Sequence, residues 1–238
     1  MSRNIIKTCT AYLLFLYSFA YAVSAYSANN SIYLTQAGGS SALTMNLTQV
    51  GGSNVIGTSQ ARVSLTGTSM TVDIVQIGDS NVIAATVAQG NSTSFTLSST
   101  GDSNTQTLAL GATGDVQNTD FDFAAQGDSN VLLYTQGDAA TSTGANADFD
   151  ISGTSNNLNV KCNVVGCVNS WEISGDGNDI DTVQANNADH SITADITGNS
   201  NNIDVDQTSN GGSVSNVLDI VAATNSGVID VDQCTSGC

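Results

Sequence analysis

The sequence predicts an all-β protein, a β-solenoid of about eight or nine strand–turn–strand coils whose strands form two facing parallel sheets. Three observations predict it. A Gly-x-x-Asn-x-apolar motif recurs every 22–27 residues, and a fixed period in this range is typical of stacked repeats. Apolar and polar residues alternate on both sides of the motif, which is the pattern of β-strands. The 238 residues include no proline, as expected where strand N–H groups are needed for pairing.

The motif supplies one turn in every coil. Glycine and asparagine both tolerate positive φ, so Gly-x-x-Asn suits a tight turn between two strands. The predicted repeat-turn residues are Gly51 and Asn54, Gly78 and Asn81, Gly101 and Asn104, Gly127 and Asn130, Gly153 and Asn156, Gly175 and Asn178, and Gly198 and Asn201. A degenerate last copy begins at Thr224, with Gly227 at the asparagine position and Ile229 at the apolar position.

The residues that flank the motif indicate the core. The position four residues before each turn is apolar in every copy: Leu47, Ile74, Leu97, Phe123, Phe149, Trp171, Ala194 and Ile220. A unit of two short strands cannot bury its apolar face alone, whereas stacked units bury a continuous core. An antiparallel sandwich with strands at similar spacing is the competing fold, and the constant register of the turns favours the solenoid.

Residues 1–25 are predicted to be a secretory signal peptide, and residues 26–238 to be the repeat domain. Arg3 and Lys7 form a positive n-region, residues 11–23 are apolar, and small residues precede a cleavage position after Ala25. The apolar run is shorter than the ~20 residues that a membrane span needs. We therefore expect a secreted protein with no membrane insertion after signal removal.

Charge and residue usage argue against several functions. The chain has 21 acidic and 4 basic residues, a formal net charge of −17, and nucleic-acid binding needs clustered Lys and Arg. It has one histidine, His190, and no Gly-x-Ser-x-Gly motif, which leaves little for hydrolytic catalysis. We expect His190 to be an exposed loop residue and the protein not to be an enzyme.

The run from Gln49 to Gln60, with Gly51 and Asn54 inside it, closely resembles the curlin repeat. Gln76-Ile-Gly-Asp-Ser-Asn matches the first half of that repeat, and the likeness covers about residues 31–233. The chain is therefore similar to the curlin-repeat family, as a divergent member. The resemblance implies stacking glutamines, which are Gln36, Gln49, Gln60, Gln76, Gln136, Gln184, Gln207 and Gln233.

The resemblance to the curlins implies a curli-type functional amyloid subunit. Such a protein is a structural or adhesive component of a biofilm matrix that self-assembles edge to edge into cross-β extracellular filaments. It reaches the cell surface by Gram-negative-type export, with an outer-membrane secretion apparatus and a related fibre subunit as partners. The alternative interpretation is a monomeric or end-capped solenoid, stabilised by calcium, that binds a surface glycan or protein.

Two close cysteine pairs are candidates for local disulfides, Cys162 with Cys167 and Cys234 with Cys238. An exported protein folds in an oxidising compartment, where such pairs form bridges. Metal binding is the rival interpretation, but the spacing is not that of a zinc site and no histidine accompanies the pairs. A bridge at the C-terminal pair would tighten a loop over the last coil and limit growth at that end.

Acidic residues also recur at fixed repeat positions. Asp181, Asp204 and Asp230 share an outward strand position, and Asp206 and Asp232 share another. Stacked carboxylates repel each other, and Ca²⁺ prefers oxygen ligands, so the first three are calcium candidates. The alternative is a solvated row of carboxylates that keeps the protein soluble, and no other cofactor is expected.

Overall fold

The computed structural model describes residues 19–25, 42–51, 53–57, 63–78, 81–101, 104–110, 116–137, 143–185, 190–209, 216–223 and 226–234. These residues form strands and turns and include no helix, which confirms the predicted all-β class. Accordingly, no helix in these ranges is long and apolar enough to cross a membrane.

The strands lie in two parallel ladders. One contains β1 (Phe19–Ala25), β2 (Leu43–Val50), β4 (Met70–Ile77), β6 (Ser94–Thr100), β8 (Val116–Gln126), β10 (Thr143–Ser152), β12 (Val165–Ser174), β14 (Ser191–Thr197) and β16 (Val217–Ala223). The other contains β3 (Val63–Thr68), β5 (Val82–Asn91), β7 (Thr105–Leu110), β9 (Val131–Gln136), β11 (Asn157–Cys162), β13 (Asp179–Ala185), β15 (Asn202–Thr208) and β17 (Val228–Cys234). A short parallel pairing between β5 and β8 connects the two ladders.

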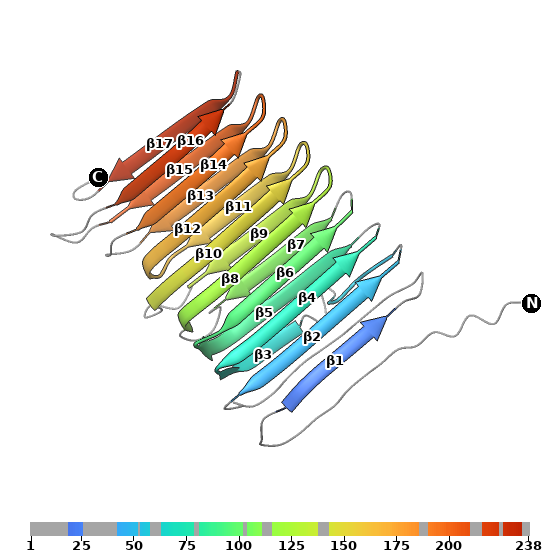
Figure 1. Ribbon diagram of the computed structural model, residues 1–238. Helices are drawn as coiled ribbons and strands as arrows, with labels where there is room; N and C mark the ends of the chain where they lie inside the picture. Colours follow the sequence, from blue (N-terminus) through green and yellow to red (C-terminus); the bar gives the residue numbers. More distant parts are fainter. Residues whose placement is uncertain are drawn as a thin grey trace, which may run out of the picture.

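Each strand pairs in parallel with the equivalent strand of the next coil, and equivalent repeat positions lie side by side. Ile74 of β4, for example, pairs with Leu47 of β2 and with Leu97 of β6. Figure 1 shows the resulting stack, in which the strands follow one another in chain order from β1 to β17. Because every described pairing is parallel, the antiparallel sandwich is excluded and the β-solenoid is confirmed.

The number of coils is close to the expectation of eight or nine. Six coils, from β4 and β5 to β14 and β15, have a neighbouring coil on both sides. The coils that contain β2 and β3, and β16 and β17, lie at the ends. The solenoid therefore has about six complete interior turns, which is slightly fewer than the eight or nine coils predicted.

The core lies between the two ladders. Alternate residues of the strands inside the stack are buried, as in β9 and β15, because successive side chains of a strand point to opposite faces. At the middle of the stack, the Phe121 ring of β8 packs against the Tyr134 ring of β9, with 4.5 Å between centroids. Phe149 and Trp171 continue this aromatic cluster along the stack. Burial strongly raises the pKa of Tyr134, whose hydroxyl donates a hydrogen bond to Gln136 Oε1.

The strand β1 lies inside the segment predicted to be the signal peptide. It pairs in parallel with β2 through seven register pairs, from Phe19 with Leu43 to Ala25 with Gln49. The boundary between signal peptide and repeat domain stays a prediction, but β1 ends at the residue after which cleavage is expected.

Candidate functional site: polar ladders and the ends of the solenoid

The turn glycines form a column along the stack. Their φ angles lie in a region that only glycine adopts readily, at Gly51 (122°), Gly78 (121°), Gly101 (130°), Gly127 (130°), Gly153 (135°), Gly175 (132°) and Gly198 (129°). Five of these glycines also lie against the turn glycine of the preceding coil: Gly78, Gly101, Gly153, Gly175 and Gly198. A Cβ atom at Gly153 would be 2.1 Å from the carbonyl oxygen of Gly127, and one at Gly175 would be 1.9 Å from that of Gly153. The column therefore requires glycine on two grounds.

The turn asparagines form a buried hydrogen-bonded ladder. Asn130 Nδ2 donates to the carbonyl of its own turn glycine, Gly127, at 2.7 Å. Its backbone N–H donates at 2.9 Å to Oδ1 of Asn156 in the next coil. The same bond to the next coil joins Asn156 to Asn178 at 3.0 Å and Asn178 to Asn201 at 2.9 Å. The side chains of Asn81, Asn104 and Asn178 close their own turns in the same way as Asn130. The predicted asparagines, from Asn54 to Asn201, are all buried.

A third turn position was missed by the sequence analysis. Ser129, Ser155 and Ser200, each directly before a turn asparagine, adopt φ between 57° and 59°. In the coil that begins at Gly175, this position is occupied by Gly177, with φ of 67°. The glycine there was a signal that the position favours positive φ, although serine at the other copies obscured it.

The predicted glutamines form columns in both ladders. Gln76 Nε2 donates to Gln49 Oε1 at 2.9 Å in the first ladder. In the second ladder, Gln207 Nε2 donates to Gln184 Oε1 at 2.8 Å, and Gln233 Nε2 donates to Gln207 Oε1 at 2.6 Å. Gln136 lies in the same column, next to Cys162. Gln36 and Gln60 lie outside the described residues.

The acidic residues lie in rows on the outer face of the second ladder. Asp181, Asp204 and Asp230 occupy one register position, as predicted. Desolvation raises the pKa of Asp206, and the neighbouring carboxylates, Asp204 first, raise it further. Over the described part of the chain, no group of three or more His, Cys, Asp and Glu side chains is placed to hold a metal ion. The three calcium candidates are thus brought into one row, and calcium binding itself stays a prediction.

Amide groups partly compensate the acidic rows. Asn159 Nδ2 donates to Asp181 Oδ2 at 3.0 Å, and Asn202 Nδ2 donates to Asp179 Oδ1 at 2.8 Å. On the first ladder, burial followed by the charges of Asp120 and Asp148 raises the pKa of Asp122. Both faces therefore carry carboxylates whose charged form is disfavoured by their surroundings.

A disulfide between Cys162 and Cys167 connects the end of β11 to the start of β12. Both cysteines are buried, in a small cluster with Ala145 and Val164. Cys234 is also disulfide-bonded, and its predicted partner Cys238 lies outside the described residues.

His190 lies beside this disulfide, and the expectation that it is an exposed loop residue is wrong. Its side chain is 1% exposed, and its Nδ1 accepts a hydrogen bond from the Cys167 N–H at 3.3 Å. His190 directly precedes β14 and follows Cys167 in an inward column, so the parallel register buries it. This column lies outside the turn motif, so the motif does not indicate it.

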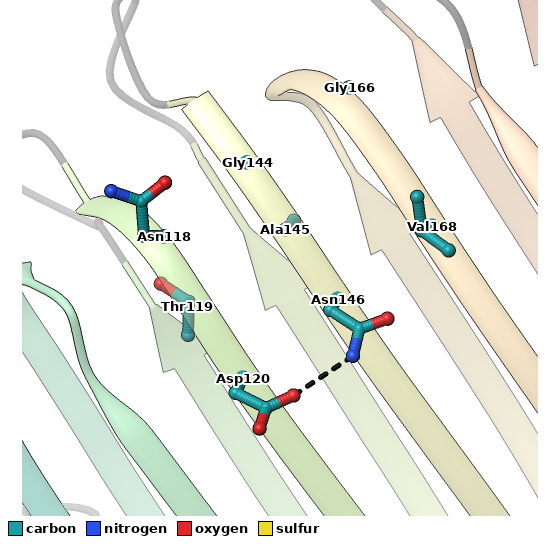
Figure 2. A pocket seen from close by; sticks show the side chains of 8 residues that line it. All are labelled: Asn118, Thr119, Asp120, Gly144, Ala145, Asn146, Gly166 and Val168. Atoms are coloured by element: carbon teal, nitrogen blue, oxygen red, sulfur yellow. Dashed lines mark hydrogen bonds between the residues drawn. The ribbon is translucent and has the colours of Figure 1, made fainter.

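A shallow groove crosses the outer face of the first ladder, as Figure 2 shows. Its volume is about 460 Å³, and it is lined by Asn118, Thr119, Asp120, Gly144, Ala145, Asn146, Gly166 and Val168. The hollow arises because glycines follow Asn118 at the same register position in β10 and β12. At its edge, Asn146 Nδ2 donates to Asp120 Oδ1 at 2.9 Å.

The two ends of the solenoid differ. In the last coil, the inward residues Ile229 and Val231 are 41% and 36% exposed, although the residues before them in the same columns, Ile203 and Val205, are fully buried. No coil covers this end within the described residues, so its backbone edge and apolar columns are open to a partner.

No family model, no curated protein and no solved structure matches this chain.

Proposed function

We propose that the chain is a secreted structural subunit that self-assembles, end to end through its strand edges, into cross-β extracellular filaments of the curli type. The open C-terminal end carries the proposal, since it presents unpaired strand edges and the exposed apolar residues Ile229 and Val231. Unpaired strand edges are templates for further pairing. In a filament, the first coil of the next copy would continue both ladders, and the protein performs no chemistry.

The polar columns support continuation in the same register. From Asn104 to Asn178, the N–H of each turn asparagine donates to the Oδ1 of the asparagine in the following coil. The last turn has Gly227 in place of asparagine, and its N–H has the same position in the repeat. In a stacked pair, Oδ1 of Asn54 of the next copy would be the acceptor for that N–H. The Gln184–Gln207–Gln233 column would likewise add side-chain hydrogen bonds along the filament.

The location and partners follow from the predicted signal peptide and the curlin resemblance. We propose export to the extracellular space or cell surface through an outer-membrane secretion apparatus. A related fibre subunit is the proposed partner besides further copies of the chain. The high density of outward carboxylates disfavours nucleic acid as a partner because phosphates would be repelled.

A second candidate function is a monomeric binding module for a surface glycan or protein. The groove at Gly144 and Gly166 favours it, because its floor exposes backbone and its edge carries Asp120 and Asn146. A disulfide at Cys234, near the last coil, would suit such an end-capped form. The two functions differ in the behaviour of the purified protein at high concentration.

The test is a polymerisation time course of residues 26–238, with and without preformed seeds, followed by electron microscopy and fibre diffraction. We expect seeded growth and a meridional reflection near 4.7–4.8 Å. Ile229→Lys, which places a charge in the open apolar column, should stop elongation. Val228→Lys is the matched control, because Val228 points outward on the same strand and should leave growth unchanged. Persistent monomer at high concentration contradicts the filament proposal and favours the binding module.

A further inference from the structure

The N-terminal end of the solenoid is covered, in contrast to the C-terminal end. In β2, the inward residues Leu43, Met45 and Leu47 are at most 3% exposed. The inward residues of β17 at the other end are more than ten times as exposed. The strand β4 pairs with one edge of β2, and β1 pairs with the other edge.

The register of β1 is that of another coil. Its seven pairs with β2 are parallel, like those between β2 and β4, and Figure 1 shows β1 beside β2 at the end of the stack. Tyr21 and Val23 take the register positions that Leu218 and Ile220 take in β16 at the far end of the same columns. In a filament, β16 of another copy would pair with the same edge of β2 in the same register. The strand β1 therefore occupies the position that β16 of another copy would take.

We propose that β1 is an intramolecular cap. It covers the edge of β2 to which β16 of a preceding copy would bind, and it blocks stacking there until residues 1–25 are removed. This inference rests on the proposed filament function and names its regulation. The predicted cleavage position follows Ala25, which is also the last residue of β1, so one cleavage removes the whole strand. Processing of the signal segment during export then opens the N-terminal end, and assembly begins only outside the cytoplasm.

The tether makes such a cap effective. Residues 26–42 join β1 covalently to β2, so β1 competes for the edge of β2 intramolecularly, at an effective concentration of about 1 mM. Against another copy at about 1 µM, β1 has a roughly thousandfold advantage for the same edge. Another copy can pair with both strands of the first coil, whereas β1 pairs with β2 alone among the described strands. The cap should therefore lengthen the lag phase rather than abolish polymerisation.

The experiment compares polymerisation before and after cleavage of one protein. A protease site is inserted after Ala25 of the full chain, and aliquots with and without protease are followed under identical conditions. A second full-chain variant carries Tyr21→Pro and Ala22→Pro. Successive N–H groups of a strand point to opposite edges, so one of these two prolines removes an N–H that faces β2. Ile5→Pro with Ile6→Pro is the matched control, with the same two prolines outside β1.

We expect cleavage to shorten the lag at least about tenfold, and the β1 proline variant to polymerise without cleavage as fast as the cleaved protein. The control variant should stay as slow as the uncleaved chain. Equal lag phases before and after cleavage, or a β1 proline variant as slow as its control, overturn the cap while leaving the filament function intact. Failure of the cleaved protein to polymerise at all overturns the filament function and the cap with it.

Discussion

Gly153→Ala tests the in-register stacking of the turns. The added Cβ would lie 2.1 Å from the oxygen and 2.6 Å from the carbonyl carbon of Gly127, both backbone atoms that no side-chain rotation can displace. The φ of 135° adds backbone strain of about 1–3 kcal/mol. Relief requires the two turns to separate, which weakens the hydrogen bonds that the Gly127 N–H donates to the Ser152 carbonyl and the Ser129 N–H donates to the Thr154 carbonyl, each worth about 0.5–1.5 kcal/mol.

Together these effects predict a loss of about 2–6 kcal/mol in the free energy of unfolding. For a chain of this length, that loss lowers the thermal midpoint by roughly 10 °C, measurable by circular dichroism of the freshly diluted monomer. The matched control is Gly166→Ala. Gly166 has a φ of 76°, but a Cβ there meets nothing within 4 Å, so it should lose only about 1–2 kcal/mol. Equal losses in the two variants would refute the close approach of successive turn glycines.

The remaining predictions concern the turn asparagines, the turn serines and the acidic rows. Asn156→Ala leaves the buried Asn130 N–H without its acceptor and should lower the free energy of unfolding by about 1–3 kcal/mol, measured by denaturant titration. The control is Asn157→Ala, on the exposed face, which should lower it by less than about 1 kcal/mol in the same titration. Ser155→Gly should raise the free energy of unfolding by about 0.5–1.5 kcal/mol, and the thermal midpoint with it, because glycine tolerates the φ of 58° at this position. Gly177 occupies the equivalent position of the next coil, with a φ of 67°. An unchanged or lower midpoint contradicts the strain at Ser155. Because the folded-state pKa of Asp206 is raised above 3.8, its carboxyl stabilises the fold at pH values below its unfolded pKa, and this contribution is lost as pH rises through the folded pKa. Asp206→Asn should therefore be more stable than the parent at pH 7 and lose that advantage near pH 3, and a difference that does not depend on pH refutes the assignment.

The fold could be predicted from the sequence because one pattern determined it at every coil. The turn glycine and asparagine set the register, and the position of Leu47, Ile74 and Leu97 recurs at a fixed distance from them. In a parallel stack, residues at equal distance from the turn necessarily become neighbours, which the strand pairing confirms. The same register brings Cys162 beside Gln184, in the glutamine column of the second ladder.

Features that lie away from the turn could not be predicted in this way. Successive motifs are 22–27 residues apart, so positions far from the turn do not recur at a constant distance from it. His190 is buried because the parallel pairing of β12 with β14 brings it beside Cys167, and the turn motif does not indicate this position. The groove at Gly144 arises similarly, from glycines that become neighbours only through pairing of β10 with β12. The cover over β2 was missed because the signal segment was treated as absent from the fold.

End-to-end stacking in register is tested most directly by cross-linking between copies within a filament. Thr48 of β2 and Val221 of β16 occupy the same outward register position at opposite ends of the stack. In a filament they would lie about 4.8 Å apart on adjacent strands, within the Cα separation of a disulfide. Mixed filaments of Thr48→Cys and Val221→Cys should form dimers on mild oxidation, with the new bond located by mass spectrometry.

Filaments that combine Thr48→Cys with Val217→Cys are the control, because four residues of strand separate the two positions by about 13 Å. Stacking in register predicts efficient cross-linking in the first mixture and little in the second. Cross-linking that is absent from the first mixture, or equal in both, would contradict stacking of one copy's first coil on another copy's last.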